Sequence, residues 1–120
     1  MSDKSILIIC RSAPYGSSAA RDALDLALTC SVFEQPVSLL FLDDALFQLI
    51  PGQAPAAIGQ KNLNAIQQSL PLYDIDRLYV GAGALSSRGL NAEDLILPVT
   101  PIAETEIPRL LADHTTVLSV

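Results

Sequence analysis

The sequence predicts an α/β fold, with one three-layer domain over residues 1–120 and a mostly parallel five-stranded sheet covered by helices on both faces. Two observations carry this prediction. Five apolar runs have the length of strands, and segments with helical periodicity separate most of them. Strands that alternate with helices pair in parallel through right-handed crossovers. A length of 120 residues suits one hydrophobic core and therefore one domain.

The apolar runs set the expected strands. They are Ile6–Cys10, Val37–Leu42, Arg77–Val80, Leu95–Val99 and Thr116–Val120. Several of these runs are apolar at almost every position, as expected for strands that helices bury on both faces of a parallel sheet.

The first two helices are predicted from periodicity and from capping residues. The first runs from Ala19 through Leu28, has Ser17 or Ser18 as its N-cap, and places Ala20, Leu24, Ala27 and Leu28 on one face. The second is short and covers Asp44–Leu49. Asp44 is expected to cap it, and Pro51 and Gly52 end it.

Two further helices are predicted in the second half of the chain. One covers Lys61–Leu70, with Leu63, Ile66 and Leu70 inward, and Pro71 ends it. The other covers Ala103–Ala112, with Ile107, Leu110 and Leu111 inward. The segment between residues 52 and 61 is expected to be a loop.

Composition narrows the classes of partner. The net charge is −6, and 7 basic residues are scattered along the chain, so we expect no direct binding of nucleic acid. Hydrophobic residues make up 50% of the chain before glycine is counted, whereas ordinary domains reach about 45–50% with glycine included. We therefore expect a large subunit interface in addition to the two-sided sheet.

No membrane association is expected, because no apolar run approaches the roughly 20 residues that a membrane-spanning helix needs. The residues before the first strand do not resemble a signal peptide, and we therefore expect a cytoplasmic protein.

Cys10 and Cys30 are the two cysteines, and neither belongs to a CxxC motif. With a single histidine, the chain lacks the ligands of an ordinary zinc site, so we expect no metal and no cofactor. Both thiols are expected to be buried and reduced. Cys10 ends a predicted strand, where Arg11 and the following helix could lower its pKa, and it is the candidate reactive thiol.

The other polar candidates have simpler structural interpretations. The Gly16–Ser18 loop could bind an anion or be a plain turn. The stretch from Gly81 through Gly83 to Arg88 could approach a ligand, or form a small-residue helix packed on the sheet. His114 is interpreted as a surface connector residue. The sequence on its own therefore contains no self-sufficient active site.

The segment from Asp44 to Gln53 follows a predicted strand, where parallel α/β domains build functional loops. It has no nucleophile and no histidine, but it has apolar side chains and a Pro-Gly turn. This composition favours a docking surface over an acid–base site. The candidate partner-binding residues are Phe47, Gln48, Leu49, Pro51, Gly52 and Gln53.

Several segments together resemble one family along the whole chain. They are Ser12–Gly16, Arg21–Asp25, Asp44–Gln53, Leu70–Ile75, Ser87–Leu90 and Thr100–Ile102, and the Phe-Gln-Leu-x-Pro-Gly-Gln block is the most specific. The chain resembles the TusC/DsrF group of the DsrE-like sulfur-relay superfamily, the C subunits of TusBCD complexes. The resemblance implies a heterohexamer with TusB-like and TusD-like subunits. Such a complex passes persulfide sulfur to a downstream acceptor, toward 2-thiouridine at tRNA wobble positions.

In that family, the resemblance implies, a cysteine of the D subunit carries the sulfur, at the end of the strand before a small-residue loop with Arg-Gly. The corresponding position in this chain is Gly81, which has no thiol. The expected role is a non-catalytic structural subunit, which is not an enzyme by itself. The alternative is a sulfurtransferase that uses Cys10 as the persulfide carrier.

Overall fold

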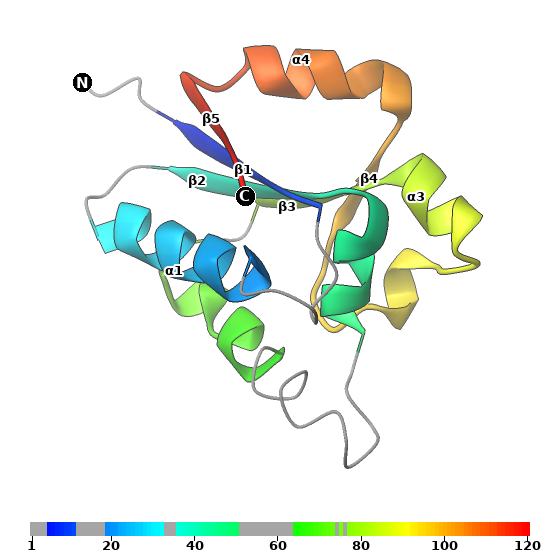
Figure 1. Cartoon of the computed structure of the whole chain (residues 1–120), viewed down its shortest axis with the longest axis horizontal. Helices are drawn as coiled ribbons and strands as arrows, with labels where there is room; N and C mark the ends of the chain where they lie inside the picture. Colours follow the sequence, from blue (N-terminus) through cyan, green and yellow to red (C-terminus); the bar gives the residue numbers. More distant parts are fainter. Residues whose placement is uncertain (1–4, 12–18, 33–35, 51–63, 74, 76) are drawn as a thin grey trace.

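The structure, a computed structural model, describes residues 5–11, 19–32, 36–50, 64–73, 75 and 77–120. Its five strands are β1 (Ile6–Cys10), β2 (Val37–Phe41), β3 (Arg77–Gly81), β4 (Thr100–Ile102) and β5 (Thr116–Ser119). They form one sheet in the order β4-β3-β2-β1-β5, and all neighbouring strands are parallel. The predicted parallel α/β fold is therefore confirmed (Figure 1).

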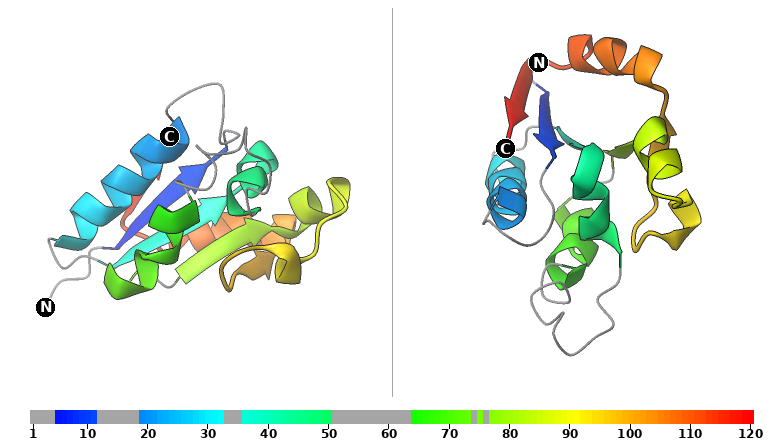
Figure 2. Two further views of the ribbon diagram at one scale, coloured as in Figure 1. Left: turned by 90° about the horizontal axis from the view of Figure 1, so that it is seen from below. Right: turned by 45° about the vertical axis from the view of Figure 1, so that its right-hand side comes forward.

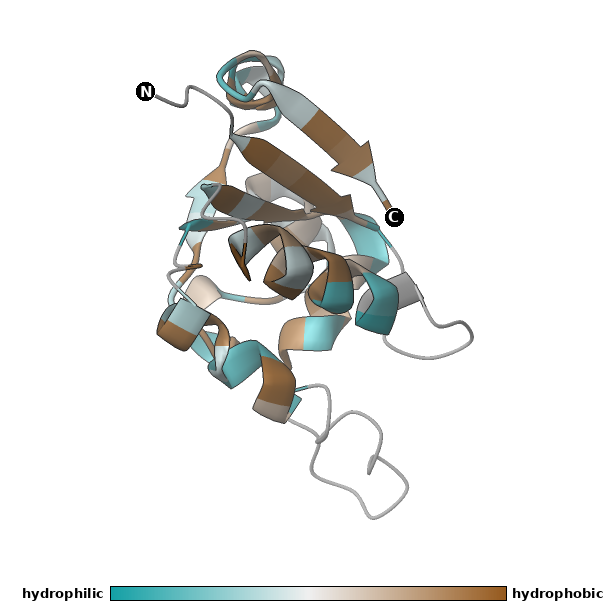
Figure 3. Ribbon diagram, turned by 90° about the vertical axis from the view of Figure 1, so that its left-hand side faces the viewer, coloured by the Kyte–Doolittle hydropathy of each residue, from teal (hydrophilic) through white to brown (hydrophobic). Residues whose placement is uncertain are grey.

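The middle strand, β2, and its neighbour β1 carry the core. All five residues of β1 and all five of β2 are buried, and both strands are strongly hydrophobic (Figure 3). Because the sheet is parallel, the carboxyl ends of its strands meet at one edge. Cys10 pairs with Phe41, and Phe41 pairs with Val80, so β1, β2 and β3 end side by side.

Helices cover both faces of the sheet, as predicted (Figure 2). One face packs against α1 (Ala19–Val32), the 3-10 helices η1 (Asp43–Leu49) and η3 (Leu70–Tyr73), and a helical segment at residues 64–68. The other face packs against α4 (Ile107–Ala112), which follows the 3-10 turn η5 (Glu104–Glu106). Two further elements, α3 (Ala82–Ser87) and η4 (Ala92–Asp94), lie between η3 and η5 in the sequence. None of the helices in the described ranges is long and apolar enough to cross a membrane.

Alternate residues of each strand point to opposite faces, and this alternation divides the core in two. On the α1 face, Ile8 and Cys10 of β1 join Leu39 and Phe41 of β2. On the α4 face, Leu7, Ile9 and Leu40 pack with the buried Leu110 of α4 and with half-buried neighbours that include Leu42, Tyr79 and Ile102.

The prediction of the fourth strand was wrong. Residues 95–99 form no strand, and β4 lies at Thr100–Ile102 instead. The apolar run still enters the core, because Leu95 and Leu97 are buried, and the Ile96 N–H donates to the Leu49 carbonyl at 2.9 Å. β4 is an edge strand, which explains why it tolerates Pro101, a residue without an N–H to donate.

The other predicted elements are close to those observed. The first helix begins at Ala19 and buries Leu24 and Ala27, but it extends to Val32. The helix predicted from Lys61 is helical at residues 64–68, and η3 follows it. Ser17, Ser18, the Gly16–Ser18 loop and residues 61–63 lie outside the described residues. The last predicted helix is divided into η5 and α4, with Leu110 inward as expected.

His114 connects α4 to the sheet and is more than a surface residue. Its ring is half-buried, with Nδ1 2.8 Å from the Leu110 carbonyl oxygen and Nε2 3.1 Å from the Ser38 hydroxyl oxygen. Both contacts are satisfied together when Nδ1–H donates to the carbonyl and the Ser38 O–H donates to Nε2. The ring therefore holds the end of α4 against β2.

Candidate functional site

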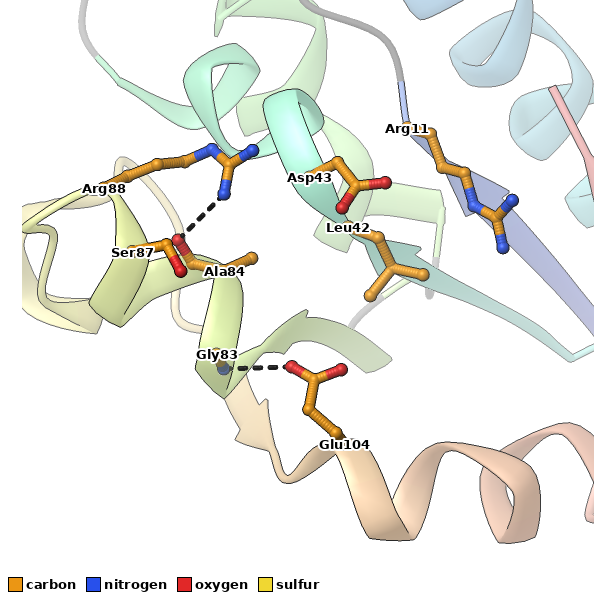
Figure 4. Close-up of a pocket in the computed structure, with 8 residues that line it drawn as sticks. All are labelled: Arg11, Leu42, Asp43, Gly83, Ala84, Ser87, Arg88 and Glu104. Atoms are coloured by element: carbon orange, nitrogen blue, oxygen red, sulfur yellow. Dashed lines mark hydrogen bonds between the residues drawn. The ribbon is translucent and has the colours of Figure 1, made fainter.

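A pocket of about 440 Å³ lies at the carboxyl edge of the sheet, where parallel α/β folds place their sites (Figure 4). Its walls come from the ends of several elements. Arg11 follows β1, Leu42 and Asp43 follow β2, α3 contributes three residues, and Arg88 and Glu104 complete the lining. Asp43 has a φ of 51°, a left-handed backbone conformation that is uncommon for a residue other than glycine.

Arg88 joins α3 to η1. Its Nη2 lies 2.9 Å from Asp44 Oδ1, and its Nη1 donates to the Ala84 carbonyl at 3.3 Å. The guanidinium also lies over the Phe47 ring, with Cζ 6.0 Å from the ring centroid. The buried Nε has no hydrogen-bond partner within the described part of the chain. Arg88 is thus held in place by contacts within the chain itself.

Asp44 does not cap η1 as the sequence predicted. The 3-10 helix begins at Asp43, and its N-cap residue, Leu42, makes no side-chain capping hydrogen bond. The Asp44 carboxylate instead pairs with Arg88. The Asp44 carboxylate therefore binds Arg88, 44 residues away in sequence, and does not accept a hydrogen bond from the first backbone amides of the helix as capping rules predict.

Glu104 closes the pocket on the side of α3. Its Oε1 accepts a hydrogen bond from the Gly83 N–H at 3.1 Å (Figure 4). A Cβ atom on Gly83 would lie 2.5 Å from the same oxygen, so the contact requires glycine at this position or a shift of the Glu104 side chain.

Gly81, the position that the resemblance assigns to sulfur transfer, is buried and ends β3 directly before α3. A Cβ atom on Gly81 would lie 3.1 Å from Leu42 Cδ2 and 3.7 Å from Glu104 Oε1, and both residues line the pocket. Any side chain at position 81 would therefore meet the pocket wall. The segment from Ala82 to Ser87 is a helix, in agreement with the simpler of the two interpretations of this stretch.

Cys10 lies near the same edge but on the other face. Its thiol belongs to the core beneath α1, whereas Gly81 is two residues after Tyr79, which packs on the α4 face. Burial raises the pKa of the Cys10 thiol to about 12, the opposite direction from the lowering that Arg11 was expected to cause. Arg11 is exposed. Desolvation by burial therefore sets the direction of the shift in the Cys10 pKa.

The candidate docking segment contributes more to the core than expected. Gln48 and Leu49 are buried at 1% and 0% exposure, and the Asn64 side-chain amide donates to the Gln48 carbonyl at 2.9 Å. Phe47 is half-buried and keeps part of its ring accessible. Pro51, Gly52 and Gln53 lie outside the described residues. Within the described segment, Phe47 and Ile50 are the half-buried apolar side chains, and Phe47 is the one among the predicted partner-binding residues.

Other chemistry is limited in the described part of the chain. Cys30 is half-buried in the last part of α1 and packs against the core on the α1 face. No group of three or more histidine, cysteine or acidic residues that could hold a metal ion occurs among the described residues. The described lining of the pocket thus has charged side chains and the Ser87 hydroxyl, but no thiol and no histidine.

A model of the DsrE/DsrF-like family matches residues 4–120. The chain belongs to the DsrE/DsrF-like family. A curated family relative from Pseudomonas aeruginosa, named "Protein TusC homolog", is 44% identical over 117 residues, which cover 98% of each chain. The fold is also that of the ychN protein from E. coli, whose crystal structure matches with a TM-score of 0.81 and 23% identity over 98% of this chain and 99% of that one.

Sequence analysis did not identify Glu104 or its contact with Gly83. The signal was available in principle, because Glu104 follows β4 and the carboxyl ends of parallel strands share one edge. The prediction ended the fourth strand at residue 99, so Glu104 was not expected at the carboxyl end of a strand. An error of a few residues in an edge strand therefore concealed one wall of the site.

Proposed function

We propose that this chain is a non-catalytic structural subunit of a TusBCD-like sulfur-relay complex, which passes persulfide sulfur toward 2-thiouridine at tRNA wobble positions. Membership of the DsrE/DsrF-like family and the 44% identity to a protein named TusC homolog support the relay role. In this proposal the partners are TusB-like and TusD-like chains in a cytoplasmic heterohexamer, and the chain itself makes no direct contact with nucleic acid.

One observation carries the non-catalytic part of the proposal. The residue at the end of β3 is Gly81, and neither cysteine compensates for it. A persulfide carrier needs an accessible thiol that ionises near neutral pH. Cys10 is 3% exposed with its pKa raised to about 12, and Cys30 lies in α1. The sulfur-carrying step therefore belongs to a sister subunit.

The apolar surface of the chain supports an assembly. Leu72, Tyr73 and Val32 are 84%, 48% and 70% exposed, so these large apolar side chains are accessible to a partner. Phe47 adds a partly accessible ring beside the pocket. Contact with related subunits would remove such surface from water, and its burial would favour association.

The absolute mass in solution tests the proposal. Light scattering after size exclusion would be measured on the chain alone and on the chain co-expressed with its TusB-like and TusD-like sisters. The proposal expects one stable species near twice the summed mass of the three chains. A chain that stays monomeric and binds neither sister subunit would contradict the proposed structural role.

The alternative function, persulfide transfer by Cys10, has one favourable observation, the position of Cys10 at the carboxyl end of β1. Its burial argues against it. Incubation of the folded chain with a persulfide donor, followed by mass measurement of the peptide that contains Cys10, separates the two proposals. Gain of a sulfur atom on Cys10 would favour the alternative, and an unchanged mass at Cys10 would favour the structural role.

A further inference from the structure

Glu104 places a negative charge beside the end of β3. Its Oε1 lies 3.7 Å from where a Cβ on Gly81 would be, and it accepts the Gly83 N–H, the second amide of α3. The carboxylate therefore lies beside the position into which a side chain at residue 81 would project. It also accepts the hydrogen bond from the backbone N–H of Gly83, which is close to that position. The sulfur-relay role proposed above does not require such a carboxylate.

We propose that Glu104 determines specificity by excluding a thiolate or persulfide anion from the end of β3, so that Gly81 and Glu104 together keep relay sulfur off this subunit. The inference depends on the proposed function for the meaning of position 81. Beyond the absence of a thiol at position 81, the inference adds that the Glu104 carboxylate disfavours a sulfur anion at the end of β3.

Charge repulsion is the first part of the physical argument. A like charge within about 4–6 Å disfavours the ionised form of an acid, so Glu104 would hold a thiol at position 81 in its neutral, unreactive form. Two cations line the pocket. The Arg88 guanidinium is already directed at Asp44 and at the Ala84 carbonyl, and Arg11 is exposed, so solvent screens its charge.

Competition for a donor is the second part. A thiolate at the end of β3 would gain from a hydrogen bond with a nearby backbone N–H, and Glu104 already accepts the one from Gly83. Gly83 permits this contact, since a Cβ there would lie 2.5 Å from Glu104 Oε1. Substitution of Gly83 by alanine therefore offers a second way to displace the same carboxylate without changing its charge.

The test introduces a reporter thiol with Gly81→Cys and measures its alkylation by iodoacetamide at pH 7, read by mass spectrometry of the peptide that contains position 81. Adding Glu104→Gln removes the nearby charge. The matched control adds Glu106→Gln, which removes the same charge from a second exposed residue of the 3-10 turn that contains Glu104.

The inference expects Glu104→Gln to raise the alkylation rate about three- to tenfold, and Glu106→Gln to leave it within about twofold. Gly83→Ala in the same background should also raise the rate. Equal rates with glutamate and glutamine at position 104 would overturn the inference.

A cysteine at position 81 has one close neighbour, Leu42 Cδ2 at 3.1 Å from its Cβ. If Gly81→Cys alone does not fold, adding Leu42→Val removes the contacting atom, and the rates with and without Glu104→Gln are compared in that background. The outcome is separable from the proposed function, because the mass of the complex formed by the wild-type chain is measured without any thiol at position 81.

Discussion

Asp44 and Arg88 are 44 residues apart in sequence, and they form an ion pair with an Nη2–Oδ1 distance of 2.9 Å. The pair joins η1, which follows β2, to the end of α3, which follows β3. Because Arg88 also contacts the Ala84 carbonyl and the Phe47 ring, one side chain fixes the loops of two neighbouring strands relative to each other. This arrangement shapes one wall of the pocket.

Arg88→Ala should lower the free energy of unfolding by about 1–2 kcal/mol, because it removes a partly buried pair, a hydrogen bond and a cation–aromatic contact. Asp44→Asn should cost less than about 1 kcal/mol, since Asp44 is 60% exposed. Urea denaturation measures both. Arg21→Ala is the control, because the Arg21–Asp25 pair is 3.6 Å long and exposed on both sides, and its loss should cost about 0.5 kcal/mol or less. Equal losses for Arg88→Ala and Arg21→Ala would contradict this role.

Phe47→Asp should dissociate the complex while the isolated chain stays folded. The ring is half-buried, so its replacement leaves the buried Leu46 and Leu49 in the core but puts a charge on the proposed contact surface. Size exclusion of the co-expressed subunits and circular dichroism of the isolated chain check the two halves of the prediction. Phe47→Leu, which keeps an apolar surface, should preserve assembly. A complex that stays intact with the Phe47→Asp substitution would move the contact surface elsewhere.

His114→Ala should lower the free energy of unfolding by about 1–2 kcal/mol, because it removes two hydrogen bonds and leaves the Ser38 hydroxyl, 1% exposed, without its ring partner. In a double-mutant cycle, Ser38→Ala should cost less in the His114→Ala background than in the wild type. Additive losses would show that the two side chains do not interact in solution.

Stability should fall at high pH because of Cys10. Burial raises the pKa of its thiol from 9.0 to about 12, so between these values the unfolded chain releases a proton that the folded chain retains. Below about pH 9 the thiol is neutral in both states and costs nothing. Between pH 9 and 12 the free energy of unfolding should fall by about 1.4 kcal/mol per pH unit. Cys10→Ala should remove this component, and identical pH profiles for the two chains would contradict the burial.

The inner strands could be predicted from sequence because their environment determines their composition. β1 and β2 are buried at every position, and only a nearly continuous apolar run satisfies that condition. β4 could not be placed in the same way. It has three residues at the edge of the sheet, with Pro101 in the middle, while the more apolar Leu95 and Leu97 pack on the core without pairing.

The candidate site was predictable only in part. The sequence placed Gly81 at the end of a strand. Which face of the sheet a side chain at position 81 would point to depends on the alternation of residues along β3, and this alternation puts position 81 and Cys10 on opposite faces. The burial of Gln48 and Leu49 was also missed, because an apolar helix turn can face a partner or its own core with the same residues. Long-range partners such as Arg88 for Asp44 leave no local signal.

A cysteine-free chain tests the central claim most directly. Cys10→Ala with Cys30→Ser would replace the wild-type copy in cells, and 2-thiouridine in tRNA would be measured by mass spectrometry of digested nucleosides, beside a strain that lacks the chain. If the chain is a structural subunit, the cysteine-free form should restore 2-thiouridine to the wild-type level, whereas loss of the chain should not. Loss of 2-thiouridine while the variant still assembles with its partners would contradict the account and assign a transfer step to this subunit.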